Sequence, residues 1–502
     1  MGSYFKNVML CVLILASASL SIVTFANDTE PPVRAKMNVL FIAIDDLRPE
    51  LGAYGVSQVK SPNIDALAAE GLVFDRAYAQ VPICGASRIS LLTGLYAQST
   101  GIYGIQLKKK DRLPEITSLP RHFKDNGYKT ISIGKIYHHK DDDPEAWSEA
   151  PYRAMKGSGY VTQAAKNLVV LNNRHNEKAG SKGPPTESAD VPDTWHHDGQ
   201  LAERAINKIQ SLNSQEPFFL AVGFRKPHLP FTPPKQYWDL YNPREIDLAS
   251  NPFWPKNYTK HTLNNYGELR NYFGMPKGKD DVSDQVARHL KHGYYASISF
   301  IDAQVGKILK ALSDRGLTDN TIVVVWGDHG WKLGEHKSWA KHTNFEIDSR
   351  VPLIMSVPGY NSDKNHTDAL VELVDVYPTL SELCGLTLPH HLEGISFAPL
   401  LENPDIAWKK AAFSIWVHKK YRYNEEIQVI GYAIQTHRYR YIEWKRTKTG
   451  VVEARELYDH EKDPDENINI ANQPKHSKTV TKLAKMLSAG TRKKIAGAYG
   501  NG

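Results

Sequence analysis

Residues 38–46, NVLFIAIDD, and residues 321–329, TIVVVWGDH, are built alike. Each begins with a continuous apolar run rich in β-branched side chains and ends in polar residues. Such runs are typical of strands that are covered on both faces within a parallel sheet. The polar residues then lie at the carboxyl ends of the strands, where open α/β sheets bind their ligands. These two stretches therefore predict an α/β sheet with a polar site at one edge.

Strand and helix patterns alternate between these two runs and beyond them. Further strands are predicted at 72–79, 128–133, 217–223 and 351–357, and helices at 61–71, 118–127, 198–212 and 283–316. This alternation predicts one large, doubly wound, mostly parallel α/β domain over residues 34–400.

From about residue 401 the pattern changes. Antiparallel strands are predicted at 413–417, 427–434 and 439–444, a turn-rich link at 456–459, and a closing helix at 475–487. Residues 401–502 are therefore expected to form a smaller α+β subdomain with an antiparallel sheet.

Residues 1–26 have the pattern of a secretory signal peptide. Lys6 is their one charged residue, an apolar run follows, and Ala26 offers a cleavage point. We expect a periplasmic or secreted protein with no membrane span after cleavage, although the apolar run is long enough to act as an uncleaved anchor. The net charge of +7 becomes +6 without this segment. A modest positive charge favours anionic ligands, and no nucleic-acid-binding motif is recognised.

Cys84 lies in residues 81–96, VPICGASRISLLTGLY. The apolar pattern after it predicts a short helix that ends at Gly94. Cys84 would then lie near a helix N-terminus, with the guanidinium of Arg88 four residues later, and both features favour negative charge. The residues alone leave several interpretations open: a buried hydrophobe, one half of a disulfide or a phosphatase nucleophile. A phosphatase loop would place Arg six residues after Cys, where this chain has Ser90.

Cys384 is the other cysteine that remains after signal cleavage. It follows an amphipathic helical pattern, and we expect it to be a core residue and not the disulfide partner of Cys84.

Charged residues follow four of the predicted strands. These are Asp45 and Asp46, Lys135 with His138, His228, and Asp328 with His329. A turn or a helix cap could explain each of them alone. Their convergence at one sheet edge would instead give carboxylates that need a cation between them, together with groups that can move protons.

The five residues from Cys84 to Arg88, CGASR, followed by Thr93 and Gly94, resemble the sulfatase signature C-x-P/A-S-R with its later T-G. The stretches IDDLRPELGAYG, GKIYHH, KPHLPF and WGDHGWKLGEH are also similar to the iduronate-2-sulfatase branch of that family. The resemblance extends from about Asn38 to the C-terminus. It implies the fold of the alkaline phosphatase and sulfatase superfamily.

The resemblance also implies one modified residue and one bound metal ion. A maturation enzyme would oxidise Cys84 to formylglycine (3-oxoalanine), an aldehyde that is hydrated at rest. One divalent cation, usually Ca²⁺ in this family, would be held by an oxygen of modified Cys84 together with Asp45, Asp46, Asp328 and His329.

Catalytic roles follow from the same resemblance. Arg88, Lys135 and Lys341 would neutralise the sulfate oxygens while a hydroxyl of the hydrated aldehyde attacks sulfur. His228 and Lys341 would donate to the leaving sugar oxygen, and His138 would be the base that deprotonates the second hydroxyl and expels sulfate.

The expected activity is therefore hydrolysis of sulfate monoesters on a sulfated polysaccharide or its oligosaccharides, of glycosaminoglycan, ulvan or carrageenan type. Residues 141–192 and 233–276, which are poor in regular patterns, are expected to shape the cleft. One alternative is a phosphomonoesterase or phosphonate monoester hydrolase of the same superfamily. Another is a non-catalytic binder of sulfated glycans.

Overall fold

The computed structural model describes residues 36–139, 141–154, 159–175, 182–262, 268–277, 280–360, 364–417 and 427–499. The predicted signal peptide and its cleavage site at Ala26 lie outside these residues. Lys36–Gly502 form one compact unit. No helix among the described residues is both long and apolar enough to cross a membrane.

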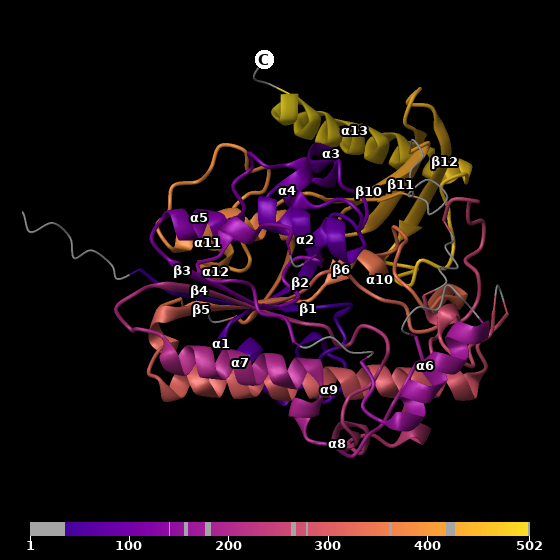
Figure 1. Ribbon diagram of the computed structural model, residues 1–502. Coiled ribbons are helices and arrows are strands. Elements are labelled where there is room, and N and C mark those ends of the chain that lie inside the picture. The colour runs from indigo at the N-terminus through magenta and orange to yellow at the C-terminus, as the bar shows by residue number, and fades with distance from the viewer. Residues whose placement is uncertain are drawn as a thin grey trace, which may run out of the picture. The chain divides into compact units, whose positions relative to one another are not determined.

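An eight-stranded sheet lies at the centre of this unit (Figure 1). Its strands are β1 (Asn38–Ile44), β2 (Leu72–Tyr78), β3 (Lys129–Gly134), β4 (Phe218–Phe224), β5 (Thr321–Gly327), β6 (Arg350–Val351), β7 (Leu353–Ser356) and β8 (His366–Glu372). The order is β3-β4-β1-β5-β7-β2-β6, with β8 paired to β2. Strands β3, β4, β1 and β5 are parallel. Because β7 is antiparallel to both β5 and β2, strand β2 runs in the same direction as the other four. The predicted mostly parallel sheet is confirmed.

Helices cover both faces of the sheet (Figure 1). Helices α1 (Pro62–Glu70), α7 (His197–Ser211) and α9 (Asp284–Asp314) pack on one face, and α2 (Cys84–Thr93), α5 (Leu119–Asp125) and α11 (Val376–Leu383) on the other. The remaining helices of this part are α3 (Ala97–Thr100), α4 (Lys109–Arg112), α6 (Gln163–His175), α8 (Lys235–Trp238), α10 (Glu346–Ser349) and α12 (Ala398–Glu402). Alternate side chains of β1 enter opposite cores, Phe41 on the α2 face and Ile42 on the α1 face. This two-sided burial explains the unbroken apolar runs in the sequence.

A second, antiparallel sheet has the order β12-β11-β10-β9. Its elements are β9 (Ala412–Val417), β10 (Val429–Gln435), β11 (Tyr439–Arg446) and β12 (Val452–Asp459), with α13 (Ser477–Tyr499) beside them. The antiparallel sheet and the closing helix were predicted, and the division near residue 400 stays a prediction.

The expected turn-rich link at residues 456–459 is wrong, because these residues end strand β12. The strand pattern was not recognised because Glu456, a charged residue, occupies a position that faces the core. Its fully buried carboxylate accepts hydrogen bonds from Trp444 Nε1 at 2.6 Å and Thr262 Oγ1 at 2.5 Å. A charged residue can therefore occupy a core position of the strand when hydrogen bonds satisfy it.

Arg440 of β11 is completely buried and forms ion pairs with Glu466, at 2.8 Å, and with Glu346 of α10. We expect Arg440→Met to destabilise the protein by about 3–5 kcal/mol, because two carboxylates lose a buried partner. Thermal unfolding monitored by circular dichroism would detect the loss. Arg244→Met is the matched control, since Arg244 is exposed and forms no ion pair with any described residue, and its melting temperature should stay near that of the wild type. Equal melting temperatures for the two variants would contradict the prediction.

Candidate active site

The carboxyl ends of β1, β3, β4 and β5 lie side by side and bring together the polar residues that follow them. Asp45 and Asp46 follow β1, Lys135 follows β3, and Asp328 follows β5. All four residues are at most 8% exposed. Gly134 allows β3 to turn against β4, because its φ is +85° and a Cβ would lie 2.2 Å from the Gly223 carbonyl oxygen. Lys135 Nζ then reaches Asp45 Oδ2 at 2.5 Å.

Cys84 is the first residue of α2, and the helix ends at Gly94 with a φ of +67°, as predicted. Cys84 is 4% exposed, and both Cys84 and Cys384 are free thiols. Burial opposes ionisation of Cys84, yet the positive charges of Lys135 and Lys341 lower its pKa. Burial raises the pKa of Cys384 to about 12, against the effect of a hydrogen bond with Tyr128. Cys384 is therefore an inert core residue, and the disulfide interpretation of Cys84 is excluded in this structure.

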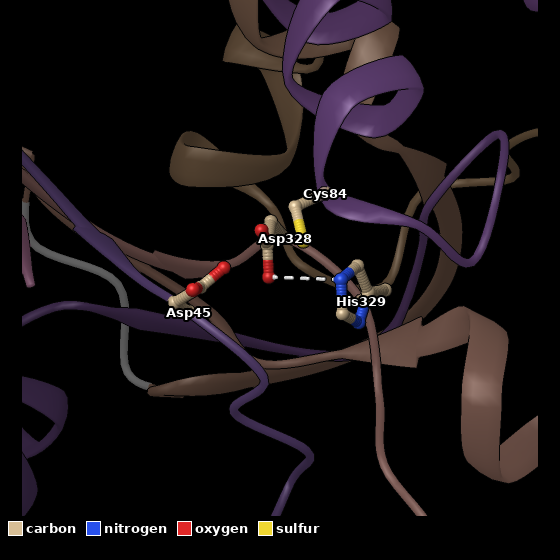
Figure 2. Close-up of side chains that lie close together, drawn as sticks. All are labelled: Asp45, Cys84, Asp328 and His329. Carbon is tan, nitrogen blue, oxygen red and sulfur yellow. Dashed lines mark ion pairs between the residues drawn. The ribbon is translucent and has the colours of Figure 1, made fainter. Parts of the chain in front are cut away.

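Cys84 faces a cluster of potential metal ligands. Figure 2 shows its sulfur beside the carboxylates of Asp45 and Asp328 and the ring of His329. The ligand atoms of these four residues lie within 4.8 Å of one another. Asp46 adjoins them, with its Oδ1 atom 3.5 Å from His329 Nε2. Its backbone has a φ of +61°, a left-handed conformation that aspartate tolerates better than most residues.

The chemistry of this cluster fits a hard divalent cation. Three buried carboxylates converge, and oxygen ligands of this kind suit Ca²⁺. His329 Nε2 is buried without a hydrogen-bond partner among the described residues. Burial opposes protonation of His329, but Asp328, Cys84 and Asp46 raise its pKa to about 9. The cluster therefore attracts positive charge to this point.

Three cations surround the cluster. Arg88 is fully buried, and its Nε donates to Asp328 Oδ2 at 2.7 Å while its Nη2 donates to Asp45 Oδ1 at 3.3 Å. Lys341 Nζ donates to Asp46 Oδ1 at 2.7 Å. With Lys135, these residues place positive charge around Cys84 in a site from which most water is excluded, where electrostatic attraction is strong.

His228 lies on the loop after β4 and contacts two acceptors. Its Nδ1 atom is 2.7 Å from the Leu229 carbonyl oxygen, and its Nε2 atom is 3.1 Å from Glu268 Oε1. Burial and Lys341 lower the pKa of His228, to about 3. The contacts favour the opposite charge state, because a neutral ring would place a lone pair against an acceptor. The ionised carboxylate of Glu268, 3.1 Å from Nε2, therefore stabilises an imidazolium that can donate a proton.

His138 follows β3, three residues after Lys135, and the charges of Lys135 and Asp45 act on its ring. Burial and the charge of Lys135 lower that pKa to about 3, so the ring is neutral at pH 7. Its Nδ1 atom is buried and has no hydrogen-bond partner in the described part of the chain. A neutral imidazole with an unused nitrogen is suited to accept a proton.

Glu268 is the site residue that sequence reasoning missed. It lies in residues 233–276, predicted to be irregular, and no neighbouring motif marks it. Its carboxylate contacts both His228 Nε2, at 3.1 Å, and Lys341 Nζ, at 3.5 Å. Burial opposes its ionisation, but these two cations lower the pKa of Glu268 to about 2. An ionised Glu268 therefore holds both predicted leaving-group donors in place.

We expect Glu268→Gln to lower kcat on a sulfated sugar about 10-fold, because His228 and Lys341 lose a charged hydrogen-bond partner. Initial rates of sulfate release would measure the effect, and Glu268→Asp should recover part of the loss. A kcat equal to that of the wild type in Glu268→Gln would contradict the predicted role.

Cationic side chains, carboxylates and one cysteine lie together at this edge of the sheet. Such a site is suited to an enzyme that cleaves anionic esters. The sulfatase sequence profile matches residues 37–386, and the profile of the C-terminal part of N-sulphoglucosamine sulphohydrolase matches residues 334–493. The chain is 34% identical to iduronate 2-sulfatase of Mus musculus, over 88% of this chain and 92% of that protein.

Two solved structures show the same fold. One is a phosphonate monoester hydrolase of Agrobacterium radiobacter, with a TM-score of 0.72 and 22% identity over 91% of this chain and 96% of that one. The other, in complex with its substrate D-glucosamine-2-N,6-O-disulfate, also has a TM-score of 0.72 and 22% identity, over 91% of this chain and 98% of that one.

The chain belongs to the sulfatase family, and within that family it is similar to the iduronate 2-sulfatases. It is accordingly a sulfuric ester hydrolase. The structure brings together all the residues predicted for the site, and their individual roles stay predictions.

Proposed function

We propose that the protein is an exported sulfatase that hydrolyses sulfate monoesters on sugars of an acidic polysaccharide or its oligosaccharides. The observation that carries the proposal is the placement of Cys84, within a sulfatase signature, among Lys135, Lys341 and the carboxylate cluster. The name of the similar iduronate 2-sulfatase and the disulfated glucosamine bound in the similar structure support a sulfated sugar as substrate. The signal-like pattern of residues 1–26 supports export.

Cys84 is proposed to be matured to formylglycine, whose hydrate would supply one hydroxyl as the nucleophile and a second as the means of expelling sulfate. A divalent cation, proposed to be Ca²⁺, would be held by the modified Cys84 with Asp45, Asp46, Asp328 and His329, and would draw charge from the sulfate oxygens.

The chain's own residues perform the remaining work. Arg88, Lys135 and Lys341 stabilise the negative charge of the bound sulfate. His228 donates a proton to the departing sugar oxygen, with Lys341 beside it and Glu268 holding both. His138, neutral at pH 7, accepts the proton whose removal releases sulfate.

The phosphonate monoester hydrolase alternative shares the fold, so the fold does not decide between the two activities. The 34% identity to a sulfatase over most of both chains favours sulfate. A non-catalytic binder would be expected to lack part of the signature or of the ligand cluster, and every predicted residue is present.

The proposal is tested by sulfate release from sulfated mono- and disaccharides, using protein produced with a formylglycine-generating enzyme. Release of sulfate from a sugar, with slower release of phosphonate from a phosphonate monoester, is the expected result. Preference for the phosphonate ester would favour the alternative enzyme. Absence of both activities in protein shown to contain formylglycine would favour the binder.

Removal of the cation should slow turnover strongly. We expect dialysis against EDTA to lower kcat about 10²-fold or more, because a Lewis-acid ion contributes several kcal/mol to charge stabilisation. Added Ca²⁺ should restore the rate. Full activity in protein shown by elemental analysis to be metal-free would contradict the proposed site.

A further inference from the structure

A cavity of about 260 Å³ opens beside His228. We call it the α7 cavity, since the start of α7 forms one wall. The residues of its lining that bear on its chemistry are Lys182, Trp195, His196, Arg225, Lys226 and Tyr272. Ligand pockets for drug-sized molecules span roughly 300–1,000 Å³, so this cavity has room for about one sugar ring. Because His228 and Glu268 also line it, the cavity adjoins the active site.

Within the described part of the chain, the cations that line the α7 cavity form no ion pairs with carboxylates. Arg225 is exposed, and its guanidinium forms no ion pair with any described residue. Lys226 Nζ donates only to backbone carbonyl oxygens, those of His228 at 2.9 Å and Pro230 at 2.5 Å. Lys182 Nζ likewise donates to the backbone oxygen of Glu268, at 3.3 Å. None of the three positive charges at the cavity is therefore within ion-pair distance of a carboxylate among the described residues, although Glu268 attracts Lys182 and Asp198 attracts Lys226 from further away.

The two acidic residues of the lining are already engaged. The carboxylate of Asp198 accepts the backbone N–H groups of Arg225 and Lys226, each at 2.9 Å. Glu268 is held by His228 and Lys341. Burial, and next the positive charge of Arg225, lower the pKa of Lys226 to about 8, against the attraction of Asp198. The cavity consequently has unbalanced positive charge that an anion would neutralise.

Two further side chains are suited to a sugar ligand. His196 is only 7% exposed, and its Nε2 atom has no hydrogen-bond partner within the described residues. Such a buried nitrogen is commonly satisfied by a ligand or by water. Trp195 is 61% exposed, although large aromatic side chains are usually buried. An exposed indole beside polar groups offers a flat apolar surface to a sugar ring.

We propose that the α7 cavity binds a second anionic group of the substrate, which is a carboxylate or a second sulfate ester. Arg225 contacts this group, the charges of Lys182 and Lys226 add to the attraction, and Trp195 packs against the sugar ring. This inference rests on the proposed function, which it deepens: the preferred substrate has at least two acidic groups.

The test is isothermal titration calorimetry with the Cys84→Ala protein, which cannot consume its ligands. The three probes are galactose 6-sulfate, a monosulfated uronic acid and D-glucosamine-2-N,6-O-disulfate. We expect one or both of the doubly acidic sugars to bind about 10-fold more tightly than galactose 6-sulfate, the effect of one additional charge-assisted hydrogen bond. The probe with the larger gain identifies the second group as carboxylate or sulfate.

Substitutions test whether the tighter binding of doubly acidic sugars depends on the α7 cavity. Arg225→Gln, added to Cys84→Ala, should remove most of the gain. Arg204→Gln, which changes another exposed arginine, on helix α7 and outside the cavity lining, should keep it. Trp195→Ala should weaken all three sugars roughly 2- to 10-fold, because it contacts the ring and not the charge. Equal affinities for singly and doubly acidic sugars, or an undiminished gain in Arg225→Gln, would overturn the proposal. If the matured enzyme releases no sulfate but the gain depends on Arg225, the proposed activity fails and the subsite stands.

Discussion

Replacing Cys84 by alanine is expected to lower kcat for sulfate release by about 10⁴-fold or more, the scale of losing a catalytic nucleophile. The structure gives the physical reason. Cys84 starts helix α2, where the positive charges of Lys135 and Lys341 lower the pKa of its thiol against the effect of burial. It is also the one thiol in the cluster with Asp45, Asp328 and His329. Initial rates on a sulfated sugar would measure the loss.

Cys384→Ala is the matched control, because Cys384 is a buried free thiol far along the chain on the α11 side of the core. Its kcat should stay near that of the wild type. Mass spectrometry of the tryptic peptide 77–88 completes the test. Conversion of Cys84 to formylglycine replaces CH2–SH by CHO and lowers the mass of this peptide by about 18 mass units. An active Cys84→Ala protein would exclude the proposed chemistry. An active wild type with an unmodified thiol would exclude formylglycine.

His228→Ala is expected to lower kcat about 10²- to 10⁴-fold on sulfated sugars, the usual contribution of a general acid. A sugar alkoxide is a poor leaving group and needs a proton from His228. A 4-nitrophenolate leaves readily without one. The loss on 4-nitrophenyl sulfate should therefore be much smaller, and the comparison of the two substrates separates proton donation from general damage to the site.

His437→Ala provides the control, since His437 lies in the second sheet region with a side chain 50% exposed. It should behave as the wild type on both substrates. Equal losses on the sugar and the aryl sulfate in His228→Ala would contradict the assignment and would instead indicate a structural role for His228 beside Glu268.

Much of the fold and of the site could be predicted locally. The apolar runs that became β1 and β5 indicated strands buried on both faces, and the polar residues after them indicated the sheet edge where the site lies. The CGASR motif identified Cys84 and Arg88, because a short signature keeps its spacing in the sequence. Elements that alternate charged and apolar residues were harder to recognise, and β12 was missed because Glu456 is charged yet buried.

Tertiary structure alone decided the groupings that depend on distant segments. Glu268 has no motif of its own, and its contacts with His228 and Lys341 arise only when segments 40 and 73 residues away along the chain fold against it. The α7 cavity likewise joins residues from a loop after β4, the start of α7 and the segment around Tyr272. The sequence by itself determined the buried strands β1 and β5 and the family, and it singled out Cys84 as the proposed nucleophile, since these features depend on neighbouring residues. Ion pairing and cavity shape depend on distances in space, and folding alone sets those distances.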